Sequence, residues 1–382
     1  MPFSTSSTHP DVLIVGAGPA GLAAAIASAR QGLHVEVIDA MKPPIDKACG
    51  EGLMPDSLES LAALGFDTNL DLRDVETARL RGIRFVGDST SNEAAFPDSP
   101  GLGIRRTVLH QLLLDRAASL GVRFHWENSV QHIEHTTEGT LLYSNHQTLR
   151  AGYLVGAEGH HSRIAKWAGL TDASVHSRRI GLRQHYAITP WTDFVEVYWS
   201  NFGQAYITPN SSKEICVAFI ANKKIATPHE ALTHFPALAR RLATAQLADA
   251  PRGSITLHRK LRRVTTGNVA LIGDASGSVD AVTGEGLALC FRQAAALALA
   301  LKADDLSLYQ QAHPRIQRLP SLMSRSLLLM DRSPRLRDRV LNIFERHPSL
   351  FEQLLQKHIG YSPLRFFGAD GLLATGLHIL TN

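Results

Sequence analysis

Runs of apolar residues near the two ends of the first 300 positions predict the framework of this protein. Residues 11–15 form a short apolar stretch typical of a buried strand, and they lead into the sequence GAGPAG. An apolar helix follows and is closed by Gly32, and residues 34–38 predict a second strand. Residues 269–272 predict another strand, followed by a loop of small residues and a long, alanine-rich helix. The pattern predicts two strand–turn–helix units that belong to one domain.

Between these units the pattern changes. Residues 108–119 carry apolar positions at helical spacing. From 180 to 220 the chain alternates polar and apolar residues or forms short apolar runs, which predicts an antiparallel sheet. Residues 229–245 predict helix, and the chain after residue 305 is expected to be helical. A small meander is expected from residues 130–133, 141–143 and 153–155, and the C-terminal helices are expected to be punctuated by Pro314, Pro320, Pro334 and Pro348.

These elements predict an α/β fold with three parts. A Rossmann-like nucleotide-binding domain is expected to be discontinuous and to receive an inserted substrate domain built on the antiparallel sheet. A helical C-terminal extension follows, and its tail from 350 to 380 is apolar with few charges. The nucleotide-binding domain comprises residues 10–75, 101–175 and 265–305, the inserted domain residues 76–100 and 176–264, and the extension residues 306–382.

The composition limits the classes of protein and site. The chain has 382 residues, 44% hydrophobic and 19% charged, which is enough for a large core and more than one domain. Its three cysteines, Cys49, Cys216 and Cys290, are odd in number and widely spaced, which argues against disulfides and a C-x-x-C metal site. The histidines show no metal spacing, so they are expected to be scattered or surface polar residues and no metal is expected. The N-terminal segment lacks a signal-peptide pattern and no uninterrupted apolar run reaches transmembrane length, so a cytoplasmic location is expected.

The charge is mildly basic, with a net charge of +4 and a pI of about 9.0. No recognised nucleic-acid-binding module accompanies it, so no nucleic-acid partner is expected. Residues 325–346 concentrate arginine among apolar residues. These helices are either an ordinary solvated face or a surface that adsorbs to anionic lipid, which would make the protein peripheral to a membrane.

The first strand–turn–helix unit carries a dinucleotide-binding pattern. Gly16, Gly18 and Gly21 match G-x-G-x-x-G between a predicted strand and a predicted helix. The first glycine allows a tight turn, the second lets the backbone approach a pyrophosphate, and the third lets helix and strand pack closely. Asp39, at the end of the second strand, is placed to bind a ribose hydroxyl. This ordered context predicts a nucleotide site.

The second unit supplies features that a cofactor site needs. Asp274 directly follows a strand and Gly273, and its carboxylate can accept hydrogen bonds from cofactor hydroxyls. Gly284-Glu285-Gly286 begins the long helix, whose free N–H groups can stabilise an anion. Glu285 and Arg292 are seven residues apart on this otherwise apolar helix, so they are expected to be paired, to meet the cofactor or to line a cavity.

Together the two units resemble the FAD-dependent monooxygenases and reductases with the para-hydroxybenzoate hydroxylase fold, whose FAD-binding domain is of the GR2 type. Lys47-x-Cys49-Gly50 and Thr283-Gly284-Glu285-Gly286 are most similar to the geranylgeranyl reductase branch. The resemblance implies FAD as the bound cofactor and NAD(P)H as a transient reductant, since no second G-x-G-x-x-G is present. It implies FAD contacts for Gly16, Gly18, Ala20 and Gly21 at the pyrophosphate, Asp39 at the adenosine ribose, Arg106 at the phosphates, Val130 at the adenine, Asp274 at the ribityl chain or pyrophosphate, Lys47 in the loop near the cofactor, and Gly284, Gly286 and Leu287 at the flavin pyrimidine.

The sequence departs from the family pattern in three places. Ala157-Glu158-Gly159 stands where Asp-Gly is common, and Asp280-Ala281 stands where Asp-Pro is usual. The aromatic–x–Trp–x–Phe–Pro motif of the reductase branch is replaced by the residues from Tyr206 to Pro209. The Trp-x-Trp-x-x-Pro pattern of flavin halogenases is not recognisable, which argues against halogenation.

The function that these observations predict is an FAD-dependent oxidoreductase. A monooxygenase would use NAD(P)H and O2 to hydroxylate an aromatic or polyketide-like lipophilic molecule. The alternative, favoured by Cys49 and Gly284-Glu285-Gly286, is an ene-reductase that acts on a prenyl or other lipid double bond. A flavin-free dehydrogenase and a non-catalytic FAD-binding, membrane-associated protein are alternatives from other classes. Cys49 is the candidate catalytic residue, and Tyr206 and Arg292 are candidate substrate contacts.

Overall fold

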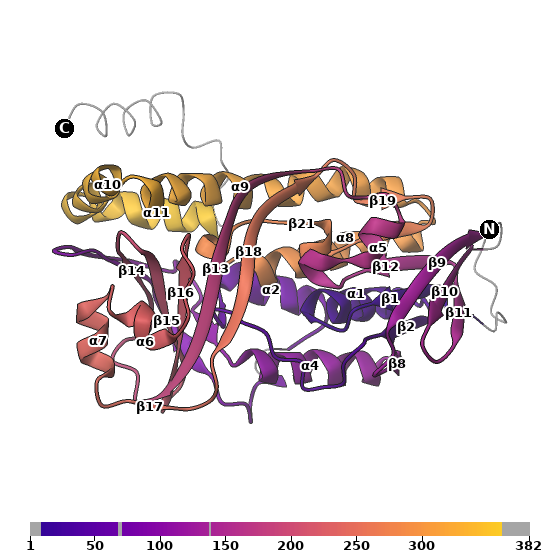
Figure 1. Cartoon of the computed structure of the whole chain (residues 1–382), viewed down its shortest axis with the longest axis horizontal. Coiled ribbons are helices and arrows are strands. Elements are labelled where there is room, and N and C mark those ends of the chain that lie inside the picture. Colours follow the sequence, from indigo (N-terminus) through magenta and orange to yellow (C-terminus); the bar gives the residue numbers. More distant parts are fainter. Residues whose placement is uncertain (1–8, 68–70, 137–138, 361–382) are drawn as a thin grey trace.

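A parallel sheet forms the centre of the first part of the fold (Figure 1). The structure is a computed structural model that describes residues 9–67, 71–136 and 139–360, so residues 361–382 of the predicted extension lie outside it. The strand order is β19-β20-β12-β1-β2-β8, and only the β19–β20 pair is antiparallel. The strands are β1 (Val12–Val15), β2 (Val35–Ile38), β8 (Arg123–His125), β12 (Tyr153–Gly156), β19 (Thr265–Thr266) and β20 (Val269–Leu271).

Helices cover this sheet, which explains why its strands β1, β12 and β20 are almost entirely apolar. All four residues of β1 are buried. Helix α1 (Pro19–Arg30) contacts both α4 (Arg106–Ser119) and α8 (Gly286–Lys302), and Figure 1 shows it between them. The expected α/β fold, with its two strand–turn–helix units in one domain core, is confirmed.

The predicted meander is right in its first two strands and wrong in its third. β9 (Val130–Thr136) and β10 (Gly139–Ser144) pair antiparallel, and the third strand is β11 (Thr148–Ala151). Residues 153–156 form β12, which lies between β1 and β20 in the parallel sheet. Leu154, Val155 and Gly156 are all buried, as a strand in the middle of a parallel sheet requires.

The predicted antiparallel sheet is present and larger than expected. Its order is β21-β18-β13-β16-β15-β14-β5-β6, with β17 beside β13. It includes β18 (Arg252–Leu261), which pairs along most of β13 (Ala173–Ala187). The remaining strands are β5 (Gly82–Val86), β6 (Ser91–Ala95), β14 (Phe194–Trp199), β15 (Gly203–Ser211), β16 (Glu214–Ala221), β17 (Gln246–Leu247) and β21 (Gly277–Ser278).

Smaller elements connect the two sheets. A further three-stranded sheet has the order β3-β7-β4, formed by β3 (Gly52–Leu53), β7 (Gly101–Gly103) and β4 (Ala78–Leu80). Its β4 and β7 contact β15, while α2 (Pro55–Ala63) contacts α8. The remaining short elements are the helix α5 (Arg163–Trp167) and the 3-10 turns η1 (Gly159–His161), η2 (Gly273–Ser276) and η3 (Ala281–Thr283).

The helical stretch predicted for residues 229–245 is two short helices, α6 (Pro228–Leu232) and α7 (Pro236–Leu242). Pro236 begins α7 because a proline is tolerated in the first turn of a helix and not in its interior. Leu238 of α7 joins one apolar cluster with Ala205 and Ile207 of β15. Tyr206, which points to the opposite face of β15, packs with a second apolar cluster.

The C-terminal helices cover that second face. They are α9 (Leu306–Arg332), α10 (Pro334–Arg346) and α11 (Pro348–His358). Pro334 and Pro348 begin helices as expected, but Pro314 and Pro320 lie inside α9 and do not end it. Phe351 of α11 packs on Phe85 of β5 with ring centroids 4.7 Å apart. Within the described residues, no helix has both the length and the apolarity needed to span a bilayer.

Candidate active site

The glycine-rich loop joins β1 to α1, and close contacts explain its first and third glycines. A Cβ on Gly16, whose φ is +105°, would lie 2.6 Å from the Ala157 carbonyl oxygen. A Cβ on Gly21 would lie 1.8 Å from the Gly16 carbonyl oxygen. A side chain at either position would therefore push the loop off β12 or the helix off the loop.

Gly18 differs, because a Cβ there would meet no protein atom within 4 Å. It precedes α1, whose N-terminus receives no hydrogen bond from a capping side chain. The first N–H groups of a helix have no intrahelical partner, so this end of α1 can bind an anion. Asp39 lies beside the loop, because its Oδ2 accepts a hydrogen bond from the Ala17 N–H at 2.7 Å. Open backbone and an adjacent carboxylate fit a pyrophosphate and a ribose.

The second strand–turn–helix unit lies against the first. A Cβ on Gly273 would lie 2.6 Å from the Ala20 Cβ, so the two motifs are in contact. Asp274 follows, and its Oδ2 lies 3.4 Å from His160 Nε2. Gly284 has a φ of +69° and ends the turn before α8, and Glu285 provides no capping hydrogen bond to that helix. The uncapped N-terminus of α8 is therefore a second place for negative charge.

One cavity of about 810 Å³ adjoins both motifs. It extends from Ala20 and Asp274 to Phe85 of the large sheet and Phe351 of α11. Most of its other wall residues are apolar, including Val197. The structure brings nine of the predicted site residues to this cavity: Ala20, Lys47, Cys49, Arg106, Tyr206, Asp274, Gly284, Gly286 and Leu287.

The remaining predicted residues lie outside the cavity lining. Gly16, Gly18, Gly21 and Asp39 form the loop behind it, as described above. Val130 begins β9, and its carbonyl oxygen accepts a hydrogen bond from Arg163 Nη1 at 3.0 Å. Arg292 Nη2 lies 2.6 Å from Asp56 Oδ2. The ligand roles of Val130 and Arg292 therefore stay predictions.

The loop that carries Cys49 is anchored by Glu51. The Glu51 N–H lies 3.4 Å from Cys49 Sγ, and Glu51 Oε1 accepts a hydrogen bond from the Arg106 N–H at 3.1 Å. Arg106 also donates from Nη1 to the Ile45 carbonyl. Desolvation, followed by the negative charge of Glu51, raises the pKa of Cys49. Cys49 is therefore a neutral thiol near neutral pH, not a thiolate.

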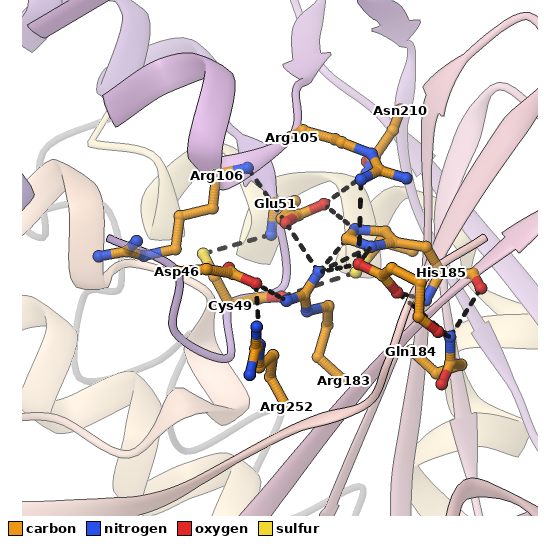
Figure 2. A network of polar contacts seen from close by, with 12 residues as sticks. Asp46, Cys49, Glu51, Arg105, Arg106, Arg183, Gln184, His185, Asn210 and Arg252 are labelled. Carbon is orange, nitrogen blue, oxygen red and sulfur yellow. Dashed lines mark hydrogen bonds and ion pairs between the residues drawn. The ribbon is translucent and has the colours of Figure 1, made fainter. Parts of the chain in front are cut away.

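A buried polar network surrounds Glu51 (Figure 2). Its Oε2 lies 2.6 Å from His185 Nε2, while His185 Nδ1 lies 2.7 Å from Asp249 Oδ2. Arg183 adds ion pairs to Asp249 at 3.1 Å and to Asp46 at 2.7 Å. Positive and negative side chains thus alternate next to the loop that carries Cys49. Their ion pairs tie this loop to β13.

The expectation that the histidines are scattered or surface residues is wrong for several of them, because His110, His185, His258, His313 and His358 are buried. His185 is 1% exposed and lies between two carboxylates. Desolvation lowers its pKa, but the hydrogen bonds with Glu51 and Asp249 outweigh this effect and raise the pKa overall. His160 lines the cavity. The sequence carries no local signal for the positions of His185 and His160, because their partners come from distant segments.

Three potential metal ligands lie in the same network. Atoms of Glu51, His185 and Cys216 lie within 4.8 Å of one another. Glu51 and His185 already interact, and Glu51 also accepts a hydrogen bond from Asn210 and faces Arg183 at 3.8 Å. A guanidinium beside the carboxylate opposes a metal cation, so the chemistry of this cluster fits an internal ion-pair network.

Two buried carboxyls lie near the N-terminus of α8. Glu285 is 1% exposed, and neither of its oxygens accepts a well-formed hydrogen bond from another described residue. His358 Nδ1 lies 3.6 Å from its Oε2. Desolvation, followed by the charge of Asp56, raises the pKa of Glu285. This carboxyl therefore keeps its proton at pH values at which an exposed glutamate has lost it. Arg292 pairs with Asp56 and not with Glu285.

The glycine loop, the two uncapped helix ends and the shared cavity agree with a family match. Residues 9–307 match the family model described as an FAD-binding domain. The chain belongs to the FAD-binding domain family. This flavoprotein is an FAD-dependent oxidoreductase, as its sequence predicts.

Curated relatives add named enzymes. The chain is 28% identical to a menaquinone reductase of Mycolicibacterium smegmatis over 306 residues, which cover 74% of this chain and 73% of the relative. It is 26% identical to digeranylgeranylglycerophospholipid reductase 1 of Methanothermobacter thermautotrophicus over 300 residues, 73% of this chain and 74% of the relative. The resemblance to geranylgeranyl reductases is thereby confirmed.

Solved structures share the fold. A flavoprotein/dehydrogenase from Cytophaga hutchinsonii has a TM-score of 0.78 at 20% identity, with 92% of this chain and 93% of that chain covered. The flavin-dependent brominase Bmp2 has a TM-score of 0.75 at 16% identity, with 98% and 99% covered. At these identities the likeness concerns the architecture and not the reaction.

Proposed function

We propose that this flavoprotein is a reductase that saturates a carbon–carbon double bond in a lipophilic, prenyl-type substrate. The observation that carries the proposal is the largely apolar cavity that begins at the two cofactor motifs and ends under the C-terminal helices. The names of the curated relatives support it, because they are reductases of menaquinone and of a digeranylgeranyl lipid. Hydroxylation of an aromatic or polyketide-like molecule is the second candidate, since the same motifs accommodate it.

The cofactor end of the cavity fits FAD. Gly18 and the first turn of α1 would hold the pyrophosphate, Asp39 the ribose, and Asp274 the ribityl chain. The start of α8 from Gly284 would face the flavin ring and stabilise negative charge there. Bound FAD supplies a hydride after its reduction, for which NAD(P)H is the proposed donor.

The residues of the chain itself would exclude water and provide the proton. Saturation breaks the π bond and forms two C–H bonds, one from the hydride and one from a proton. Cys49 lies in the cavity wall, and its raised pKa keeps the thiol protonated. We assign it the proton transfer to the substrate carbon. Tyr206 Oη donates to the Val282 carbonyl at 2.7 Å, which orients the ring as part of the wall and not as the acid.

Anaerobic single-turnover experiments test the reaction. The reduced holoenzyme is mixed with a prenylated quinone or a geranylgeranyl lipid, and flavin absorbance and product mass are followed. We expect flavin oxidation and a product that has gained two hydrogen atoms without oxygen. A product that gains one oxygen atom only when O2 is admitted would support hydroxylation instead.

Cys49→Ala tests the assigned proton donor. Loss of a general acid typically costs at least about 100-fold in rate. We expect that loss in substrate-dependent flavin oxidation, with FAD content and flavin reduction by NAD(P)H unchanged. An equal loss in both half-reactions would mean that Cys49 supports the cofactor and not the proton transfer.

A further inference from the structure

The outer face of α9 carries a regular series of arginines and leucines. Spacings of three and four residues place six exposed side chains on one face of the helix. Two of them are Leu322, 51% exposed, and Leu329, 56% exposed. We call this series the α9 ridge, and its members are Arg315, Arg318, Leu322, Arg325, Leu329 and Arg332.

The exposed leucines of the ridge are unusual for this molecule. Seven large hydrophobic side chains of the described residues are strongly exposed, and Leu322, Leu329 and Leu308 of α9 are three of them. Leu308 lies seven residues before Arg315 and therefore on the same face. Large exposed apolar groups that gather on one helix face indicate a contact surface.

The ridge is also purely cationic. Among the described residues, none of its four arginines forms an ion pair with a carboxylate. The single acidic residue of α9 is Asp331, which faces the protein interior with 3% exposure and lies 3.4 Å from Arg179. In α10, by contrast, exposed arginines alternate with Asp338 and Glu345. The larger excess of exposed positive charge therefore belongs to α9.

The ridge adjoins the entrance of the cavity. Leu322 and Leu329 are exposed to solvent and also line the cavity, as does the exposed Ser326 between them. They therefore form part of its rim. Figure 1 shows α9 along one outer side of the molecule, with α4 on the opposite side.

We propose that the α9 ridge docks this protein onto an anionic lipid bilayer, so that the rim of the cavity faces the lipid. Guanidinium groups bind lipid phosphates bidentately, and leucines between them insert at the boundary of headgroups and acyl chains. A polynucleotide or an acidic protein would match the arginines but not the exposed leucines on the cavity rim. Docking concerns the surface and does not depend on which reaction the cavity supports.

Vesicle sedimentation tests the proposal with the full-length holoenzyme. The probes are vesicles of phosphatidylcholine alone and of phosphatidylcholine with about one third phosphatidylglycerol. We expect binding to the anionic vesicles, weakened by salt, and little binding to the neutral ones. The triple variant R318Q/R325Q/R332Q should bind anionic vesicles at least about tenfold more weakly.

Two further variants separate charge from the leucines. R73Q/R79Q/R240Q removes the same charge from exposed positions on other elements and should bind as the parent does. L322S/L329S should also weaken vesicle binding about tenfold, because it removes the inserted side chains. The proposal would be overturned if the ridge and control triple variants lost vesicle binding equally, or if neither ridge variant lost it. It would also be overturned if the unmodified protein bound a polynucleotide but not anionic vesicles. FAD absorbance of every variant confirms that the fold is retained.

Discussion

Two acidic residues of one loop show how strongly the surroundings of a side chain decide its chemistry. Asp280 and Glu285 are five positions apart, and both are almost fully buried. Asp280 binds Arg179, with Nε donating to Oδ2 at 3.1 Å, and the ion pair outweighs desolvation to lower its pKa. Glu285 accepts no such hydrogen bond, and its pKa is raised. Asp280 is thus ionised within a structural ion pair, whereas Glu285 keeps its proton.

Glu285→Gln should stabilise the apoprotein in a pH-dependent way. The folded protein holds the Glu285 proton at pH values where the unfolded chain, with a pKa near 4.5, has released it. The wild-type free energy of unfolding therefore falls as the pH rises above that value, until the raised folded pKa is passed. Glutamine has no proton to release, so the advantage of the variant should be about 1.4 kcal/mol greater for each pH unit of this window.

Urea unfolding at about pH 5 and about pH 8 measures this difference. Glu345→Gln, at an exposed position of α10, is the matched control and should change stability little at either pH. A constant difference between wild type and Glu285→Gln at both pH values would contradict the assigned protonation.

At the scale of elements, the turn between β1 and α1 separates packing from ligand binding. Gly21 supports the packing of the helix, whereas Gly18 borders open space. The same substitution should therefore have different effects at the two positions. Gly21→Ala should destabilise the apoprotein by several kcal/mol, on the order of the cost of overpacking a tight contact.

Gly18→Ala should leave the apoprotein within about 1 kcal/mol of wild type and still weaken FAD binding at least about tenfold, because its methyl group occupies the approach to the pyrophosphate. Thermal unfolding of the apoproteins and titration with FAD measure the two effects. Unchanged FAD affinity in Gly18→Ala would place the pyrophosphate elsewhere.

At the scale of the whole molecule, one buried ion-pair cluster joins the loop before α8 to α9, which is one of the helices that line the cavity. Arg179 of β13 binds Asp280 before α8 and lies 3.4 Å from Asp331 of α9. Gln204 of β15 also donates to Asp331. The cluster therefore holds the large sheet, the loop beside the proposed flavin position and the C-terminal helices in one arrangement.

Asp280→Ala should destabilise the protein by about 3–5 kcal/mol, because it removes the carboxylate that accepts two hydrogen bonds from the buried Arg179 and leaves this cation only the longer contact with Asp331. Asp193→Ala is the control, since its pair with Arg81 spans 3.1 Å between side chains that are each 57% exposed. Such a pair contributes less than about 1 kcal/mol. The stabilisation from Asp280 should disappear as the pH falls through its lowered pKa. Equal costs for both variants in urea unfolding would show that the cluster does not tie these elements together.

Local patterns alone were sufficient for much of the fold and for the cofactor. Gly16, Gly18, Gly21 and Asp39 lie within one strand–helix–strand unit, so their spacing expresses their geometry directly. The segment from Gly273 to the start of α8 is also local, so its residue spacing likewise expresses its geometry directly. The error at β12 arose because a short apolar run does not indicate which neighbours it will pair with.

The tertiary structure alone decided which polar residues meet. Glu51 and His185 are 134 positions apart, and Arg292 lies 236 positions from its partner Asp56. No periodicity connects such pairs, because they form only when separate elements pack together. The cavity likewise has walls from the large sheet, from the loop that follows β20 of the parallel sheet, and from α9 to α11. The sequence by itself determined the cofactor, whose binding uses local backbone geometry, whereas the shape and surroundings of the substrate cavity depend on contacts between distant segments.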